Sequence, residues 1–218
     1  MMRELRFDRK PALSGKTKSL VVFLHGYGAN GADLFGLANP LAPHLPDTAF
    51  LAPDAPEQAQ GGYGLQWFPI PWLDGSSEEA ARQGLARATT DLNGFLDARL
   101  AEEGLDDSAL SLLGFSQGAM MAMHVAPRRI TAMAGVVAIS GRLLEPENIG
   151  EITVKPPVLL IHGDDDQVVP FGSMAHAGEV LTGAGVETFG HVMRGTGHGI
   201  APDGLSVALT FLREHLPK

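Results

Sequence analysis

A serine lies between two glycines in Gly114-Phe115-Ser116-Gln117-Gly118, which matches the pattern Gly-x-Ser-x-Gly. The apolar run 110–113 precedes this pattern directly, and a helical stretch over 117–125 follows it. Small residues two before and two after a serine allow a sharp turn between strand and helix, which lifts the hydroxyl clear of the sheet. The motif in this setting predicts that Ser116 is a catalytic nucleophile.

A serine hydroxyl is a weak nucleophile at neutral pH, so it needs a base within hydrogen-bond reach. Six histidines follow Ser116, and of these only His198 lies in a loop flanked by glycines, Gly195-Thr196-Gly197-His198-Gly199. Such a loop leaves the imidazole free to face the serine, and we predict His198 as the base. We expect His162, which ends a strand, to turn inward as a hydrogen-bonded core residue.

The base in turn needs a carboxylate that orients its ring. The segment His162-Gly163-Asp164-Asp165-Asp166-Gln167-Val168-Val169-Pro170 follows the apolar strand 158–161, where the end of a strand delivers side chains to a site. Position in the chain alone does not distinguish among Asp164, Asp165 and Asp166.

Three consecutive aspartates could also suggest a metal site. A calcium-binding EF-hand loop starting at Asp164 would need Gly at its sixth position and Glu at its twelfth, where Val169 and Ala175 stand. The chain also lacks the His-Glu-x-x-His pair of many zinc enzymes. We predict no metal site.

Acyl transfer builds negative charge on the carbonyl oxygen of the substrate, and this charge needs hydrogen-bond donors. One donor is expected from the amide of Gln117, the residue after the nucleophile, and another from a glycine-rich loop after an early strand. His25-Gly26-Tyr27-Gly28 follows the apolar run 20–24 and fits that description. A plain tight turn would explain the same glycines.

The stretch 53–75 is rich in Gly and Pro and too long for an ordinary loop. It holds both tryptophans of the chain and several other large apolar residues: Tyr63, Leu65, Trp67, Phe68, Ile70, Trp72 and Leu73. We interpret it as a folded flap that contacts the substrate, with Leu65, Trp67, Phe68 and Trp72 as the predicted substrate-binding residues. The alternative is that these side chains only seal the rim of the core.

Apolar runs that alternate with helical stretches predict the elements that position these residues. Expected strands span 20–24, 48–52, 110–113, 135–139, 158–161 and 186–192. Helices are expected after the capping signal Ser76-Ser77-Glu78-Glu79 and over about 117–125, 172–181, 205–215 and, interrupted by Pro40, 32–45. This alternation is typical of an α/β protein with a parallel sheet and helices on both faces. We expect one domain over residues 1–218.

Composition narrows the class of partner. The net charge is −9, with scattered basic residues, which argues against a nucleic-acid partner. No apolar run reaches the ~20 residues that span a bilayer, and the start lacks the apolar core of a signal peptide, so we expect a cytoplasmic protein without membrane insertion. The chain has no cysteine, which excludes thiol nucleophiles and disulfides.

Together these motifs resemble the phospholipase/carboxylesterase family, from Ser19 to the last helix. The resemblance implies an α/β-hydrolase fold with no large cap domain and no cofactor. It implies a triad of Ser116, Asp166 and His198, through the pattern His-Gly-x-x-Asp-x-x-Val-Pro, and oxyanion donors at the amides of Tyr27 and Gln117. Trp67-Phe68 resembles the Trp-Phe-Asp segment of the family, but Pro69 replaces the acid.

The function that follows is hydrolysis of small to medium carboxylic esters through an acyl-enzyme. An acyl-protein thioesterase or lysophospholipase with a longer acyl groove is the alternative within the same class, and a small-molecule or lipid ester is the expected ligand. A non-catalytic relative would normally lack a nucleophile, base or acid, and all three are present here. Dehalogenase chemistry would require an aspartate at position 116, and dienelactone-type hydrolysis generally uses a cysteine there. A homodimer is compatible with the sequence.

Overall fold

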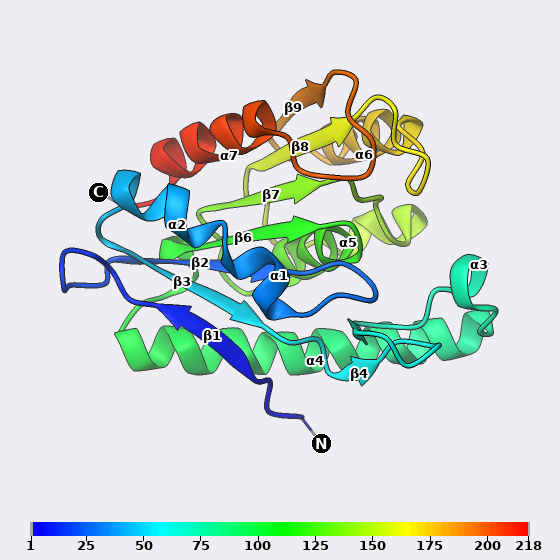
Figure 1. Cartoon of the computed structure of the whole chain (residues 1–218), viewed down its shortest axis with the longest axis horizontal. Coiled ribbons are helices and arrows are strands. Elements are labelled where there is room, and N and C mark those ends of the chain that lie inside the picture. The colour runs from blue at the N-terminus through cyan, green and yellow to red at the C-terminus, as the bar shows by residue number, and fades with distance from the viewer. Residues whose placement is uncertain (1, 218) are drawn as a thin grey trace.

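The computed structural model describes residues 2–217. A seven-stranded sheet lies at its centre, in the order β1-β3-β2-β6-β7-β8-β9 (Figure 1). All neighbouring strands run parallel except β1, which pairs antiparallel with β3 at one edge. The strands are β1 Phe7–Lys10, β2 Ser19–Leu24, β3 Thr48–Pro53, β6 Leu110–Phe115, β7 Gly135–Ile139, β8 Val158–Gly163 and β9 Thr188–Met193.

Helices cover both faces of the sheet (Figure 1) and create two apolar cores. One core packs α4, α5 and α6 against one face, and the other packs α1, α2 and α7 against the opposite face. The helices are α1 Gly31–Phe35, α2 Ala38–Leu41, α3 Pro71–Asp74, α4 Glu78–Glu103, α5 Gln117–Val125, α6 Gly172–Gly183 and α7 Pro202–His215. The central strands are buried on both faces, which explains why they read as unbroken apolar runs rather than alternating ones. The mostly parallel sheet with helices on both faces that the sequence predicts is confirmed.

The longest helix, α4, starts one residue later than its expected capping box. Ser77, rather than Ser76, is the N-cap, and its hydroxyl accepts a hydrogen bond from the amide of Ala80 over 3.1 Å. The helix ends at Glu103 and is capped by Gly104, whose φ of 66° would strain a side chain. The amide of Leu105 then donates to the carbonyl of Leu100, which closes the last turn.

The expected helix over 32–45 is wrong as a single element. It is divided into α1, α2 and a 3₁₀ turn at Ala42–His44. Pro40 explains the break, because in a continuous helix its ring would clash with the carbonyl of Gly36 and its nitrogen could not donate. Gly36 is where α1 ends.

The stretch 53–75 is folded, as expected of a flap, but it contains elements that the sequence did not predict. A two-stranded hairpin pairs β4 Glu57–Gln58 with β5 Leu65–Gln66, and α3 follows it. The hairpin docks on the loop after β2: the amide of Gly28 donates to Leu65 and the amide of Leu65 donates to Ala29, over 2.9 and 2.8 Å.

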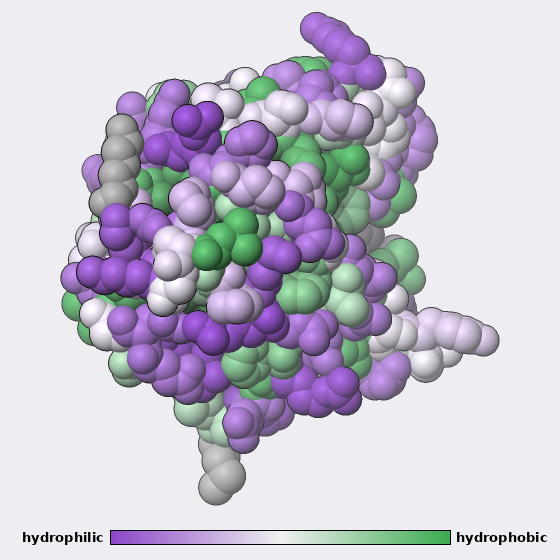
Figure 2. All heavy atoms as spheres, turned by 60° about the vertical axis from the view of Figure 1, so that its left-hand side comes forward, coloured by the Kyte–Doolittle hydropathy of each residue, from purple (hydrophilic) through white to green (hydrophobic). Residues whose placement is uncertain are grey.

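The parallel strands carry their carboxyl ends to the same edge of the sheet, where ligands bind in open α/β folds. The loops after β2, β6, β8 and β9 hold the motifs singled out above. Within residues 2–217 no helix is long and apolar enough to cross a membrane. Figure 2 shows a mostly hydrophilic surface on the face turned forward, with apolar side chains in small separate groups.

Candidate active site

Ser116 lies on a strained turn between β6 and α5. Its φ of 54° and ψ of −118° lie outside the regions that residues with side chains normally occupy, and its amide is held by the carbonyl of Ile139 over 2.9 Å. A Cβ at Gly114 would clash with the carbonyl of Gly118, and a Cβ at Gly118 would clash with the carbonyl of Leu24. Both glycines of the motif are therefore required by close backbone approach.

Asp166 and His198 are joined directly. Oδ2 of Asp166 lies 2.7 Å from Nδ1 of His198, and Oδ1 accepts hydrogen bonds from the amides of Val168 and Val169 over 2.8 and 2.9 Å. The carboxylate is completely buried, whereas 18% of the His198 side chain is exposed. With Nδ1 donating to the carboxylate, Nε2 of His198 remains available as an acceptor.

The charge state of Asp166 follows from these contacts. Burial raises the pKa of its carboxyl, but hydrogen bonds from His198 and from the amides of Val169 and Val168 outweigh burial and hold the pKa below its usual value of 3.8. The carboxylate is thus ionised at neutral pH and can stabilise a positive charge on His198.

His162 supports the same carboxylate from inside, as expected of a hydrogen-bonded core histidine. Its Nε2 lies 2.9 Å from the carbonyl of Val169 and 3.3 Å from Oδ2 of Asp166. The first contact requires a proton on Nε2, because a carbonyl only accepts. His162 thereby helps to fix the turn that carries Asp166.

The neighbouring aspartates have other partners. Asp164 accepts a hydrogen bond from the amide of Gly195 over 2.6 Å and lies 3.3 Å from Nη1 of Arg194. Asp165 is exposed, and its amide donates to the carbonyl of Thr196 over 3.0 Å. Both residues hold the loop that carries His198, but neither reaches its imidazole.

Ser116 and His198 line one cavity of about 350 Å³. The ring of His198 packs against Phe115, with 4.8 Å between ring centroids. The side-chain hydrogen bond of His198 among the described residues goes to Asp166 and not to the Ser116 hydroxyl, and bonds between a catalytic serine and its base often tighten only when substrate binds. The other walls include His25, Gly26 and Tyr27 from the loop after β2, Leu34 from α1, and Ile200 from the segment between β9 and α7.

The predicted oxyanion donors belong to the two loops that meet at Ser116. A Cβ at Gly26 would lie 3.2 Å from Cβ of Ser116, so the loop after β2 passes beside the nucleophile. Within residues 2–217 the amides of Tyr27 and Gln117 donate to no other backbone group outside the helices and strands. Gln117 opens α5, and the first amides of a helix have no partner within it.

The four predicted substrate-binding residues are spread over different environments, and none of them lines the cavity around Ser116. Trp67 and Phe68 are buried in the core. Leu65 is half-buried in the hairpin, whereas Trp72 is 58% exposed and stacks on the guanidinium of Arg142 at 4.5 Å.

Gln117 connects this flap to the nucleophile turn, a contact that the sequence did not reveal. Its buried side chain accepts a hydrogen bond from the amide of Trp67 over 2.9 Å and donates to the carbonyl of Phe68 over 2.7 Å. The indole Nε1 of Trp67 also donates to the carbonyl of His25 over 3.0 Å. Trp67 and Phe68 therefore fit the alternative interpretation, in which the aromatic side chains of the flap belong to the core.

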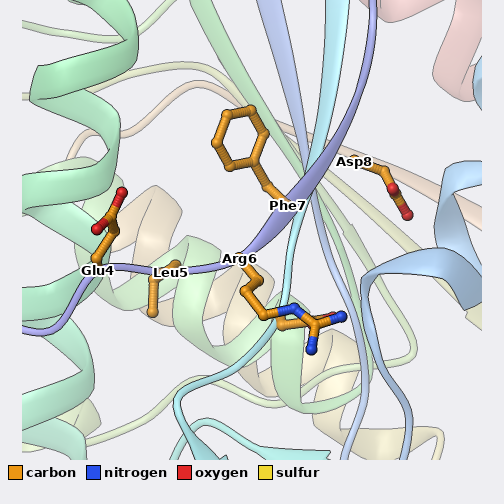
Figure 3. Close-up of a pocket in the computed structure, with 6 residues that line it drawn as sticks. Glu4, Leu5, Arg6, Phe7 and Asp8 are labelled. Atoms are coloured by element: carbon orange, nitrogen blue, oxygen red, sulfur yellow. The ribbon is translucent and has the colours of Figure 1, made fainter.

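Another hollow, of about 430 Å³, lies beside β1 and is lined by Glu4, Arg6, Phe7 and Asp8 among others (Figure 3). It carries charges of both signs and contains none of the residues predicted to do chemistry. Among the described residues no three His, Cys, Asp or Glu side chains are grouped so that they could hold a metal ion. The cavity around Ser116 is therefore the candidate active site.

Known proteins resemble this chain over nearly its whole length. The family model described as Phospholipase/Carboxylesterase matches residues 12–216. The crystal structure of esterase PE8 is 42% identical, superposes with a TM-score of 0.92, and is matched over 98% of this chain and 100% of that one.

Other relatives are more distant in sequence and also match most of the chain. Esterase YpfH of Escherichia coli (strain K12) is 26% identical over 202 residues, which cover 92% of this chain and 84% of the relative. Acyl-protein thioesterase 1 of Saccharomyces cerevisiae (strain ATCC 204508 / S288c) is 28% identical over 213 residues, which cover 91% and 93%. The chain therefore belongs to the phospholipase/carboxylesterase family, and it is a serine ester hydrolase with the α/β-hydrolase fold.

Proposed function

We propose that the protein hydrolyses small to medium carboxylic esters, with Ser116 as nucleophile, His198 as general base and acid, and Asp166 as the carboxylate that orients His198. The observation that carries this proposal is the 2.7 Å contact between Asp166 Oδ2 and His198 Nδ1, in a histidine that shares a cavity with Ser116. The amides of Tyr27 and Gln117 are the proposed oxyanion donors.

In the first half of the reaction, Oγ of Ser116 attacks the carbonyl carbon of the ester while its proton moves to Nε2 of His198. The negative charge that develops on the carbonyl oxygen is stabilised by the two amides. The bond from carbon to the alcohol oxygen then breaks, and His198 returns the proton to that oxygen. The alcohol leaves, and the acyl group remains on Ser116.

In the second half, water takes the place of Ser116 as nucleophile. The oxygen of the water molecule attacks the acyl carbon while His198 accepts a proton from that water. His198 then gives the proton to Oγ of Ser116 as the bond between the acyl carbon and Oγ breaks. A carboxylic acid is released and the enzyme is restored. Asp166 remains ionised throughout and stabilises the transient positive charge on His198.

The substrate class is tested by parallel assays on p-nitrophenyl esters from acetate to palmitate, on a lysophospholipid and on an S-acylated peptide. We expect the highest kcat/KM on the short and medium esters. A preference for the S-acylated peptide or the lysophospholipid of at least tenfold would replace the carboxylesterase proposal with the thioesterase or lysophospholipase alternative. Acyl-protein thioesterase 1 of Saccharomyces cerevisiae is the relative that supports that alternative.

We propose that residues 1–218 act as one domain in the cytoplasm, without nucleic acid and without a cofactor, and that a homodimer is compatible with activity. Sedimentation of the purified protein at assay concentration, with and without substrate, distinguishes monomer from dimer. Trp72 and Leu65 remain the flap residues proposed to contact longer acyl chains.

A further inference from the structure

His25, which the proposed reaction does not use, is completely buried and has partners for every polar atom of its ring. Nε2 lies 2.9 Å from the amide of Ala55, and Nδ1 lies 2.8 Å from the carbonyl of Gly26. The amide of Ala55 can only donate, so Nε2 must accept and the proton must be on Nδ1. Nδ1 therefore donates to the carbonyl of Gly26, and the tautomer is fixed by the fold.

The hydrogen bond from His25 to the carbonyl of Gly26 also determines where the amide of Tyr27 points. The carbonyl of Gly26 and the amide of Tyr27 belong to the same trans peptide group, so they are coplanar and point in opposite directions. Holding the carbonyl therefore also fixes the direction of the Tyr27 N–H. The carbonyl accepts a second hydrogen bond, from the amide of Ala29 over 3.3 Å, which leaves the peptide little freedom to turn.

The same peptide group borders the nucleophile. Gly26 is in reach of Ser116, since a Cβ there would lie 3.2 Å from Cβ of the serine. His25, Gly26, Tyr27 and Ser116 line one cavity. The backbone of His25 is itself held, because its carbonyl accepts the indole hydrogen of Trp67 over 3.0 Å.

We propose that His25 is a positioning residue that holds the Gly26–Tyr27 peptide in the orientation in which the Tyr27 amide can donate to the oxyanion. This proposal rests on the proposed function, and it adds a residue that touches neither the substrate nor the reacting atoms. His25 acts as a neutral donor and acceptor. Burial lowers its pKa from the usual 6.5, against the raising effects of Gly26, Asp54 and Asp33, which keeps the ring uncharged at neutral pH.

Two conservative variants separate the two hydrogen bonds of the ring. The amide nitrogen of His25→Asn can take the place of Nδ1 and donate to Gly26, whereas the side chain of His25→Gln reaches the place of Nε2 and meets Ala55 instead. His25→Phe fills the space and removes both bonds. Loss of one oxyanion donor costs about 10²- to 10³-fold in kcat. We expect a loss of roughly this size in His25→Phe and His25→Gln, and at least tenfold more activity in His25→Asn than in His25→Gln.

The measurement that distinguishes positioning from general damage is the affinity for a trifluoromethyl ketone, which forms a charged tetrahedral adduct with serine. In the His25 variants this affinity should fall in step with kcat/KM, while KM for the ester changes less than threefold. His124→Gln is the matched control, because His124 is also buried but lies at the far end of α5, and it should keep wild-type values at pH 8. If His25→Phe does not fold, the comparison of His25→Asn with His25→Gln decides.

The proposal is overturned if the folded His25→Gln keeps wild-type kcat, or if KM alone changes. It is also overturned if His25→Asn is no more active than His25→Gln. Failure of the proposed function has a different signature: wild-type turnover would then survive Ser116→Ala, whatever the His25 variants do.

Discussion

Oδ2 of Asp166 lies 2.7 Å from Nδ1 of His198, and the partner oxygen of the same carboxylate is occupied by two backbone amides. The carboxylate is therefore fixed at both ends before substrate arrives. This arrangement holds the imidazole in one tautomer and one direction, with Nε2 left to face the cavity that Ser116 lines.

The first prediction distinguishes the three neighbouring aspartates. Asp166→Asn should lower kcat by at least about a hundredfold, because an amide can hold His198 in the wrong tautomer and cannot stabilise its positive charge; the comparable protease variant loses about 10⁴-fold. Asp164→Asn and Asp165→Asn should lose much less, since neither side chain contacts His198. All three folded proteins are compared in one ester assay. The assignment of Asp166 is wrong if either neighbour proves to be the crippled variant.

The second prediction concerns Gly118, the second glycine of the nucleophile motif. Gly118→Ala should lower the free energy of unfolding by about 3 kcal/mol or more, at the upper end for overpacked sites, because the added Cβ meets the backbone carbonyl of Leu24. Gly150→Ala is the control, since nothing lies within 4 Å of a Cβ at that position. Urea unfolding measures both. Equal stability of the two variants would show that α5 can shift away from β2 at little cost.

The third prediction separates the two tryptophans. Trp67→Ala should lower the free energy of unfolding by about 3–5 kcal/mol, because the side chain is completely buried. Trp72→Ala should cost less than about 1 kcal/mol, since Trp72 is 58% exposed and its cation–π contact with Arg142 is at the surface. If Trp72 contacts longer acyl chains, its replacement should also shift the chain-length preference of kcat/KM. An unchanged preference would remove Trp72 from the proposed flap contacts.

The fourth prediction uses a buried histidine outside the site. Burial, and the nearby charge of Arg128, lower the pKa of His124 from 6.5 to about 4. His124 therefore binds a proton more readily in the unfolded chain than in the folded protein. Its contribution to the free energy of unfolding is complete above pH 6.5, where the ring is neutral in both states, and is lost as the pH falls toward 4. A shift of this size corresponds to about 3 kcal/mol.

When the pH is lowered from 7 to 4, the free energy of unfolding should accordingly fall by about 3 kcal/mol less in His124→Gln than in the wild type. Urea unfolding at several pH values measures the difference, and His176→Gln at an exposed position serves as control. Parallel stability curves for the wild type and His124→Gln would contradict the prediction.

Much of the fold could be predicted because the central strands are apolar on both faces and are separated by helical periods. β7 matches its expected bounds, and most others differ by one or two residues at an end. The edge strand β1 was missed because Phe-Asp-Arg-Lys is mostly polar, as an exposed antiparallel edge allows. The short hairpin of β4 and β5 was missed because its pairing depends on contact with the loop after β2, which no local pattern records.

The parts of the site that could be predicted are those marked by particular residue types at the ends of strands. The nucleophile turn and the histidine loop have local signals, glycines above all. The choice of Asp166 over its neighbours depends on a turn closed by Val168 and Val169 and was supplied by the family pattern. The side-chain role of His25 was missed, although its place before Gly26 was the available signal, because the partner amide at Ala55 lies 30 residues away in the chain.

Ser116 is the residue on which the proposed reaction depends most, and trapping the acyl-enzyme tests its role most directly. Rapid acid quench of the wild type during turnover of p-nitrophenyl butyrate, followed by mass spectrometry of its peptides, should show one butyryl group on Ser116. Ser116→Ala should fold normally, carry no acyl group and lose on the order of 10⁴- to 10⁶-fold in kcat. An acyl group on another residue, or a Ser116→Ala variant with activity within tenfold of the wild type, would contradict the account.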